Sequence, residues 1–121
     1  MDWRVDAGVA LAAAIEGDID TAAVHVMDWG RSEMTQGCLF WIDTFLRTSP
    51  RARQFADLPA TDGLEAEQVW ALQLVSARAR MAFEDAEKIF AIRLPAAGCL
   101  AALLTLIGTQ LRGQCNPDLF R

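Results

Sequence analysis

The sequence predicts an all-helical protein, and three observations carry that prediction. Apolar residues recur at spacings of three and four along most of the chain, which is the period of a helix buried on one face. No segment alternates polar and apolar residues with a period of two, as a half-buried strand would. Gly and Pro gather at a few points and divide the chain into segments of helical length. We therefore expect a single domain over residues 1–121, a compact bundle of five to six helices.

The first part of the chain is expected to form three helices. They cover residues 3–16, about 19–28 and about 33–47. Gly17 ends the first helix, and Asp18 can cap the second. Ser32 is a candidate N-cap for the third helix, whose Cys38, Trp41 and Phe45 should enter the core. The expected core face of the second helix consists of Ile19, Ala22, Ala23, Val26 and Met27.

The remaining helices follow one long connection, residues 48–63, where turn-forming residues predict a loop with at most one helical turn. The next 31 residues, 64–94, contain no Gly or Pro, and they form either one helix or two joined near residues 78–82. Pro95 suits the first turn of a last helix that runs to about Arg112.

A weak internal similarity suggests a duplication of residues 3–47 as residues 64–112. Gly37-Cys38-Leu39 matches Gly98-Cys99-Leu100 at an offset of 61, and Ala10-Leu11 matches Ala71-Leu72 at the same offset. Each half would then be a three-helix unit. The alternative is chance, because Ala-rich helices match one another easily.

The charge distribution argues against nucleic-acid binding. The chain has a net charge of −5, and residues 1–46 carry eight carboxylates against Arg4 and Arg31. Such a protein is repelled by phosphate backbones. Arg47, Arg51 and Arg53 follow without an acid between them. They are candidates to contact an anion or an acidic partner, although such a cluster is also typical of a solvated loop.

The cysteines and the hydropathy predict a cytoplasmic protein, and the amino-acid composition predicts a bacterial or phage origin. The three cysteines show no metal-ligand spacing, so we expect no metal site and free thiols, with Cys38 and Cys99 in the core and Cys115 the most accessible. We expect no signal peptide, because the N-terminus lacks a basic region and Asp2, Arg4 and Asp6 interrupt any apolar run. We expect no membrane association, because the longest apolar stretch is too short to cross a bilayer. No motif indicates a cofactor, and none is expected. The predominance of Arg and Ala indicates a GC-rich genome.

Catalytic groups are scarce. His25 is the only histidine and Tyr is absent. We expect His25 to be a surface residue near Thr21 and Asp28, and we assign no catalytic residue.

Two apolar features are unusual for a monomer. Phe40 falls on the polar face of its helix, so either the loop 48–63 covers it or a partner does. The last helix is apolar nearly all round, since Thr105 is the only polar side chain between Ala96 and Ile107. Such a helix is either central or shared between subunits. A ridge of small residues along it could admit a second helix: Gly98, Ala101, Thr105 and Gly108.

These observations favour a non-catalytic protein–protein interaction module, an adaptor, regulator or inhibitor that acts as a homodimer. The alternative is a small-molecule-binding regulator with an apolar pocket between helices, lined by Trp41, Phe45 and Trp70. An enzyme ranks last. A nucleic-acid mimic would suit the acidic N-terminal part, but the chain lacks a dense acidic stripe.

Overall fold

The computed structural model describes residues 3–92 and 96–121, and these residues form helices and no strand, which confirms the all-α prediction. The six α-helices are α1 (Trp3–Ile15), α2 (Ile19–Val26), α3 (Arg31–Thr48), α4 (Ala66–Ala79), α5 (Phe83–Ile92) and α6 (Ala97–Leu111). Two short 3-10 helices, η1 (Ala52–Ala56) and η2 (Pro117–Phe120), complete the described elements.

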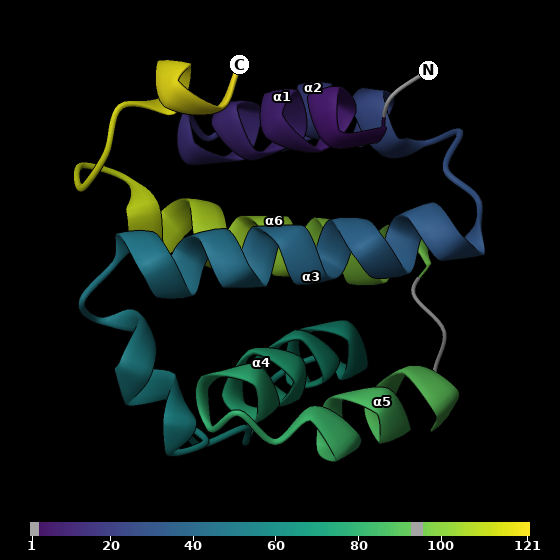
Figure 1. Ribbon diagram of the computed structural model, residues 1–121, viewed down its shortest axis with the longest axis vertical. Coiled ribbons are helices and arrows are strands. Elements are labelled where there is room, and N and C mark those ends of the chain that lie inside the picture. The colour runs from purple at the N-terminus through teal and green to yellow at the C-terminus, as the bar shows by residue number, and fades with distance from the viewer. Residues whose placement is uncertain (1–2, 93–95) are drawn as a thin grey trace.

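The helices are arranged in three layers of two (Figure 1). α1 and α2 form one outer layer, α3 and α6 lie side by side in the middle, and α4 and α5 form the other outer layer. α6 packs against α1, α2, α3 and α4. The sequence left open whether this apolar helix is central or shared between subunits. It is central in the chain, which explains why most of its circumference is apolar.

Aromatic side chains of α3 fill the core beside α6. Trp41 and Phe45 are fully buried. The Trp41 indole N–H donates to the Ala7 carbonyl oxygen at 2.9 Å, so this buried polar group is satisfied. The Trp41 ring stacks on Trp29 with 5.5 Å between ring centroids. Burial of these rings removes a large apolar area from water, which is the main force that holds the layers together.

The boundary between α1 and α2 follows the predicted pattern. Gly17 ends α1 in the left-handed conformation, with φ of 86°. Asp18 caps α2, since its carboxylate accepts the Thr21 backbone N–H at 3.1 Å and the Thr21 hydroxyl at 2.6 Å. The hydrogen bond from the Thr21 hydroxyl and the one from its backbone both stabilise the carboxylate and lower the pKa of Asp18.

The segment without Gly or Pro is two helices, separated at residues 80–82. Met81 adopts φ of 58°, a left-handed conformation that a side chain disfavours. The Met81 N–H donates to the Arg78 carbonyl oxygen at 3.0 Å, and the Ala82 N–H donates to that of Ala77 at 2.8 Å. This is the hydrogen-bond pattern that ordinarily ends a helix at glycine. The break gives each half three helices, and the duplication itself stays a prediction.

Other boundaries differ from the prediction. α3 begins two residues earlier than expected, at Arg31, with Gly30 and not Ser32 as its N-cap, because the Glu33 carboxylate accepts the Gly30 N–H at 3.2 Å. Ala23 and Met27, assigned to the core face of α2, are exposed. The connection 48–63 contains one 3-10 turn, η1. Pro95 lies outside the described residues.

Candidate interaction surface

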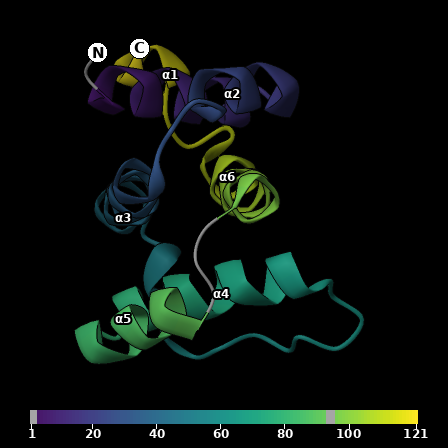
Figure 2. The same ribbon diagram turned by 90° about the vertical axis from the view of Figure 1, so that its right-hand side faces the viewer.

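One side of α6 is left open by the helices around it. In Figure 2 α6 is seen end-on, with α2 above it, α4 below it and α3 on one side, and no described helix covers the opposite side. Gly98, Thr105 and Thr109 are exposed there, while Ala101 and Ala102 are half-buried. We call these five residues, together with the half-buried Leu106, the α6 strip.

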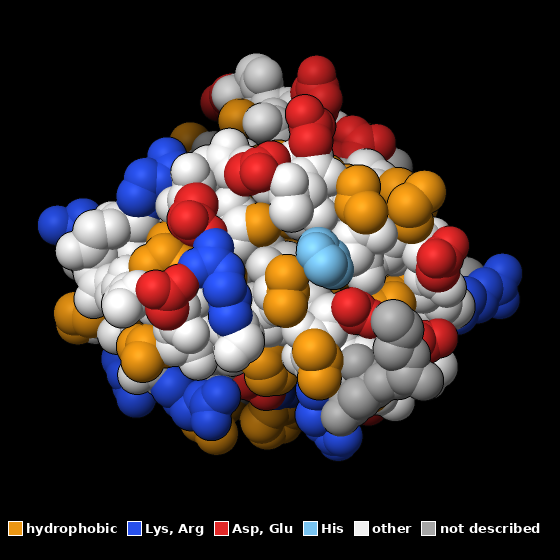
Figure 3. Space-filling view, turned by 90° about the horizontal axis from the view of Figure 1, so that it is seen from above, with side chains coloured by type: hydrophobic (Ala, Val, Ile, Leu, Met, Phe, Trp, Pro, Cys, Tyr) orange, Lys and Arg blue, Asp and Glu red, His pale blue; other side chains and the backbone are white. Residues whose placement is uncertain are grey.

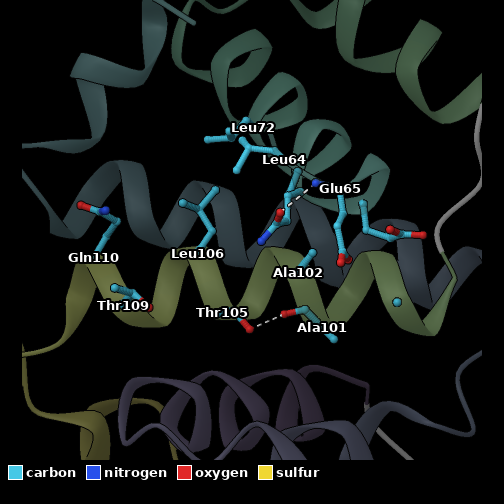
Figure 4. Close-up of a pocket in the computed structure, with 13 residues that line it drawn as sticks. Leu64, Glu65, Leu72, Ala101, Ala102, Thr105, Leu106, Thr109 and Gln110 are labelled. Atoms are coloured by element: carbon cyan, nitrogen blue, oxygen red, sulfur yellow. Dashed lines mark hydrogen bonds between the residues drawn. The ribbon is translucent and has the colours of Figure 1, made fainter. Parts of the chain in front are cut away.

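The α6 strip borders a groove of about 480 Å³ between α6 and the N-terminal part of α4. In Figure 4 Ala102, Leu106 and Gln110 point from α6 toward α4. Leu64 and Leu72 contribute the opposite wall. Four residues of this groove did not stand out in the sequence: Leu64, Leu72, Ala102 and Leu106. The spacing of Ala102 and Leu106, four residues apart and adjacent to the predicted ridge, was the one indication of this second apolar row.

The α6 strip is uncharged, and its polar side chains are those of Thr105 and Thr109. The Thr105 hydroxyl donates to the Ala101 carbonyl oxygen of its own helix at 2.7 Å (Figure 4), so the hydroxyl proton is already committed within the helix. No residue of α6 is charged. The charges of the groove come from Glu65 and Glu67 at the start of α4, where the Cγ of Glu67 lies 3.5 Å from the position that a Cβ on Gly98 would take.

The predicted ridge of small residues is divided between two roles. Gly108 is buried against α1, and a Cβ at this position would lie 2.5 Å from the Ala14 carbonyl oxygen. Gly98 and Thr105 are exposed, and Ala101 is half-buried. Gly108 therefore serves a contact inside the chain, and Gly98, Ala101 and Thr105 remain open to a partner.

Phe40 is covered from a direction that the sequence did not indicate. Its ring meets the Trp3 ring of α1 edge-on, with 6.2 Å between centroids, and it is half-buried. Phe40 is therefore covered in part from within the chain, by Trp3 of α1, a contact that neither alternative named. α3 lies on the other side of α6 from the open strip (Figure 2), so Phe40 and the α6 strip do not form one surface.

The three candidate arginines lie where α3 ends and η1 begins, and all are exposed. The Arg47 Nε donates to the Asp43 carbonyl oxygen at 3.3 Å. The Arg51 backbone N–H donates to the Ser49 hydroxyl oxygen at 3.3 Å. Within the described residues, none of Arg47, Arg51 and Arg53 forms an ion pair, so their role in binding an anion or acidic partner stays a prediction.

His25 is less isolated than expected. Its Nδ1 lies 3.6 Å from Oδ1 of Asp6, which joins α2 to α1, and the His25 side chain is about one-third exposed. In Figure 3, which looks down on α1 and α2, His25 lies among scattered carboxylates and apolar side chains. Over residues 3–92 and 96–121, no three His, Cys, Asp or Glu side chains gather as metal ligands would.

The three thiols are free. Cys38 and Cys99 are buried, as predicted, and Cys115 is half-buried. Burial in the apolar core raises the pKa of the Cys38 thiol, and the neighbouring Cys99 raises it further. Cys38 is thus held in its unreactive, protonated form.

The pocket expected around Trp41, Phe45 and Trp70 is not formed by these rings. All three are buried. Phe45 packs edge-on against Phe55 with 5.7 Å between centroids, and Trp70 packs against Phe90 at 6.1 Å. Aromatic neighbours occupy the space that a ligand would need.

No helix in the described part of the chain is both long and apolar enough to cross a membrane. No family model, curated protein or solved structure matches this chain.

Proposed function

We propose that this chain is a non-catalytic interaction module that forms a symmetric homodimer through the α6 strip. The observation that carries the proposal is an open, uncharged row of small residues on a central helix: Gly98, Ala101 and Thr105. Small side chains let a second helix approach closely, so that many van der Waals contacts form along the line of closest approach.

Charge restricts where a second copy of the chain can bind. Each copy carries a net charge of −5, so two copies repel each other over most of their surface. The α6 strip itself carries no charge, and the nearest carboxylates, Glu65 and Glu67, lie at its edge, so two strips can meet with like charges kept at the rim. A two-fold axis near Ala101 and Thr105 would place the same uncharged strip on both sides of the interface, as an isologous contact requires.

Exposed apolar side chains lie on both flanks of α6. Met27, at the end of α2, is 69% exposed, and Leu64, just before α4, is 38% exposed. Together with the strip they extend the apolar surface from α2 to α4. Exposed apolar surface of this kind is typical of interaction sites.

Light scattering on the purified protein tests the proposal. We expect wild type to have twice the monomer mass at high concentration. Ala101→Leu inserts a bulky side chain where the backbones should be closest, and Thr105→Arg places two like charges near the axis. Both variants should be folded monomers by circular dichroism. Ala91→Leu and Gln73→Arg introduce the same side chains at exposed positions of α5 and α4, and these control variants should remain dimeric.

A wild-type protein that is monomeric at every concentration would contradict the proposal. So would variants at positions 101 and 105 that dimerise as tightly as the controls.

We further propose that the protein works in a reducing compartment such as the cytoplasm. Support comes from the three free thiols, which an oxidising environment would tend to pair. Mass measurement of protein isolated without reductant tests this point, and a disulfide within the chain would contradict it.

A further inference from the structure

A second apolar cavity, of about 110 Å³, lies between α2, α3 and α6. Its deep wall consists of buried side chains, Val26 of α2 and Leu100 and Leu104 of α6. Its entrance lies between Ala23 and Met27 of α2 and Ala97 of α6, all of which are exposed. The cavity therefore has a packed interior and a path to solvent.

The chemistry of the wall selects the occupant. Every side chain that lines this cavity is apolar. Water needs two or more hydrogen-bonding partners to be stable in a cavity, and these side chains offer none. A charged or strongly polar ligand would lose its hydration without compensation. A compact hydrocarbon group is the kind of occupant that gains from this wall.

The volume sets the size of that group. An apolar cavity of about 150 Å³ in another protein stays dry and binds benzene or xenon. The present cavity is somewhat smaller, but Met27 and Met34 line it, and unbranched methionine side chains adapt their shape to what they contact. The exposed position of Met27 leaves it free to move outward.

We infer that this cavity is a binding site for a small uncharged apolar molecule of the size of a monocyclic aromatic or a short branched alkane. The site opens between α2 and the first turn of α6. Ala101 lines both this cavity and the groove beside the α6 strip, so the two sites adjoin. Benzene binding is therefore compared in wild type and in the monomeric variant Thr105→Arg.

Benzene is the probe that tests this inference. We expect a saturable rise in the thermal midpoint of wild type, together with shifts of the Met27 and Met34 ε-methyl resonances. Phenol has nearly the same shape, but its hydroxyl keeps its hydration only in the orientation that points it out through the entrance, and it has no partner in any other. It should therefore bind at least about tenfold more weakly than benzene.

Ala23→Leu places a larger side chain in the entrance and should abolish the benzene-dependent shifts. Ala97→Leu blocks the entrance from α6 and serves as a second variant should the first fail to fold. Ala91→Leu makes the same substitution on the exposed face of α5 and should bind benzene as wild type does.

The inference is overturned if benzene causes no saturable change in wild type, if the blocked variants respond as wild type does, or if phenol binds as tightly as benzene. Thr105→Arg separates this inference from the proposed function. A monomeric Thr105→Arg that still binds benzene supports both, and a dimeric wild type that does not bind benzene contradicts the cavity site alone.

Discussion

Gly108 of α6 lies directly against the backbone of Ala14 in α1. A Cβ on Gly108 would be 2.5 Å from the Ala14 carbonyl oxygen and 3.0 Å from the Ala14 Cβ. Real side chains do not approach backbone so closely, so the crossing of these two helices requires a residue without a side chain. This contact fixes α6 beneath α1, and with it the direction in which the open strip faces.

Gly108→Ala should therefore lower the free energy of unfolding by about 1–3 kcal/mol, because the added methyl group forces α1 and α6 apart. Gly98→Ala is the matched control on the same helix. The nearest atom to its new Cβ is the Glu67 Cγ at 3.5 Å, an ordinary contact. Alanine there should be neutral or stabilising by up to about 1 kcal/mol. Urea denaturation measures the free energy of unfolding of both variants. Equal effects of the two substitutions would contradict the close contact assigned to Gly108 alone.

Met81 ends α4 in a conformation that suits glycine. Met81→Gly should raise the free energy of unfolding by about 0.5–1 kcal/mol. The left-handed backbone costs a side chain roughly 1–2 kcal/mol, and the greater freedom of glycine in the unfolded chain offsets part of that gain. Met81→Ala keeps a Cβ and should give no gain. Gly17 occupies the same place at the end of α1, so Gly17→Ala should destabilise. If Met81→Gly proved no more stable than Met81→Ala, strain at this turn would be excluded.

The helix ends at Gly17 and at Met81 show which boundaries could be predicted from the sequence. Gly17 and Asp18 carry the local chemistry of a helix end and the next helix start, so the boundary between α1 and α2 was predictable. Met81 carries no such indication, because its left-handed turn is formed by a residue that does not favour that conformation, where α5 turns back to pack against α4. The sequence therefore left one helix or two as alternatives.

Contacts between distant segments also determine which of these residues are covered and which are open, and the sequence alone does not reveal such contacts. The small residues on α6 were visible, but Gly108 is distinguished from Gly98 only by the crossing of α1. Trp3 packs against Phe40 from a different helix, α1, and no local sequence pattern reveals this contact. The groove exists because Leu64 and Leu72, which come from an earlier segment of the chain, lie opposite α6.

Arg78 joins α4 to α3. Its Nη2 donates to both carboxylate oxygens of Asp43 at 2.8 Å, and its guanidinium lies 5.0 Å from the centre of the Phe83 ring. Because Asp43 is 44% exposed, solvent weakens the pair. A double-mutant cycle with Asp43→Ala and Arg78→Ala should give a coupling of about 0.5–1 kcal/mol.

Arg78→Ala alone should cost more than Asp43→Ala, because it also removes the contact with Phe83. A coupling free energy indistinguishable from zero would show that the ion pair contributes nothing to the packing of α4 against α3.

Thiol chemistry should separate the cysteines. Burial raises the pKa of Cys38 and, to a lesser extent, of Cys115. Only the thiolate reacts, so iodoacetamide at mildly alkaline pH should label Cys115 before Cys38. The labelling of Cys115 should be slower than that of a small thiol in solution, and Cys38 should be labelled only after unfolding. Mass spectrometry of the digested protein measures the order. Labelling of native Cys38 at the rate of Cys115 would contradict its burial.

The raised pKa of Cys38 also predicts a pH dependence. Its protonated form is favoured in the folded state, so the corresponding stability is complete below the unfolded thiol pKa of about 8.5. It is lost as the pH rises above that value, because unfolded thiols then ionise while folded Cys38 does not. Denaturation across this range should show an alkaline decline that is smaller in Cys38→Ala. An equal decline in both proteins would assign it to other groups.

Disulfide cross-linking at position 105 tests the proposed interface most directly. In a symmetric dimer a residue near the two-fold axis faces its own copy. Thr105→Cys, in a chain that carries Cys115→Ser, should therefore form a covalent dimer under mild oxidation at concentrations where Gln73→Cys, exposed on α4, does not. Cross-linking at position 105 that is absent, or no faster than at position 73, would contradict a dimer built on the α6 strip.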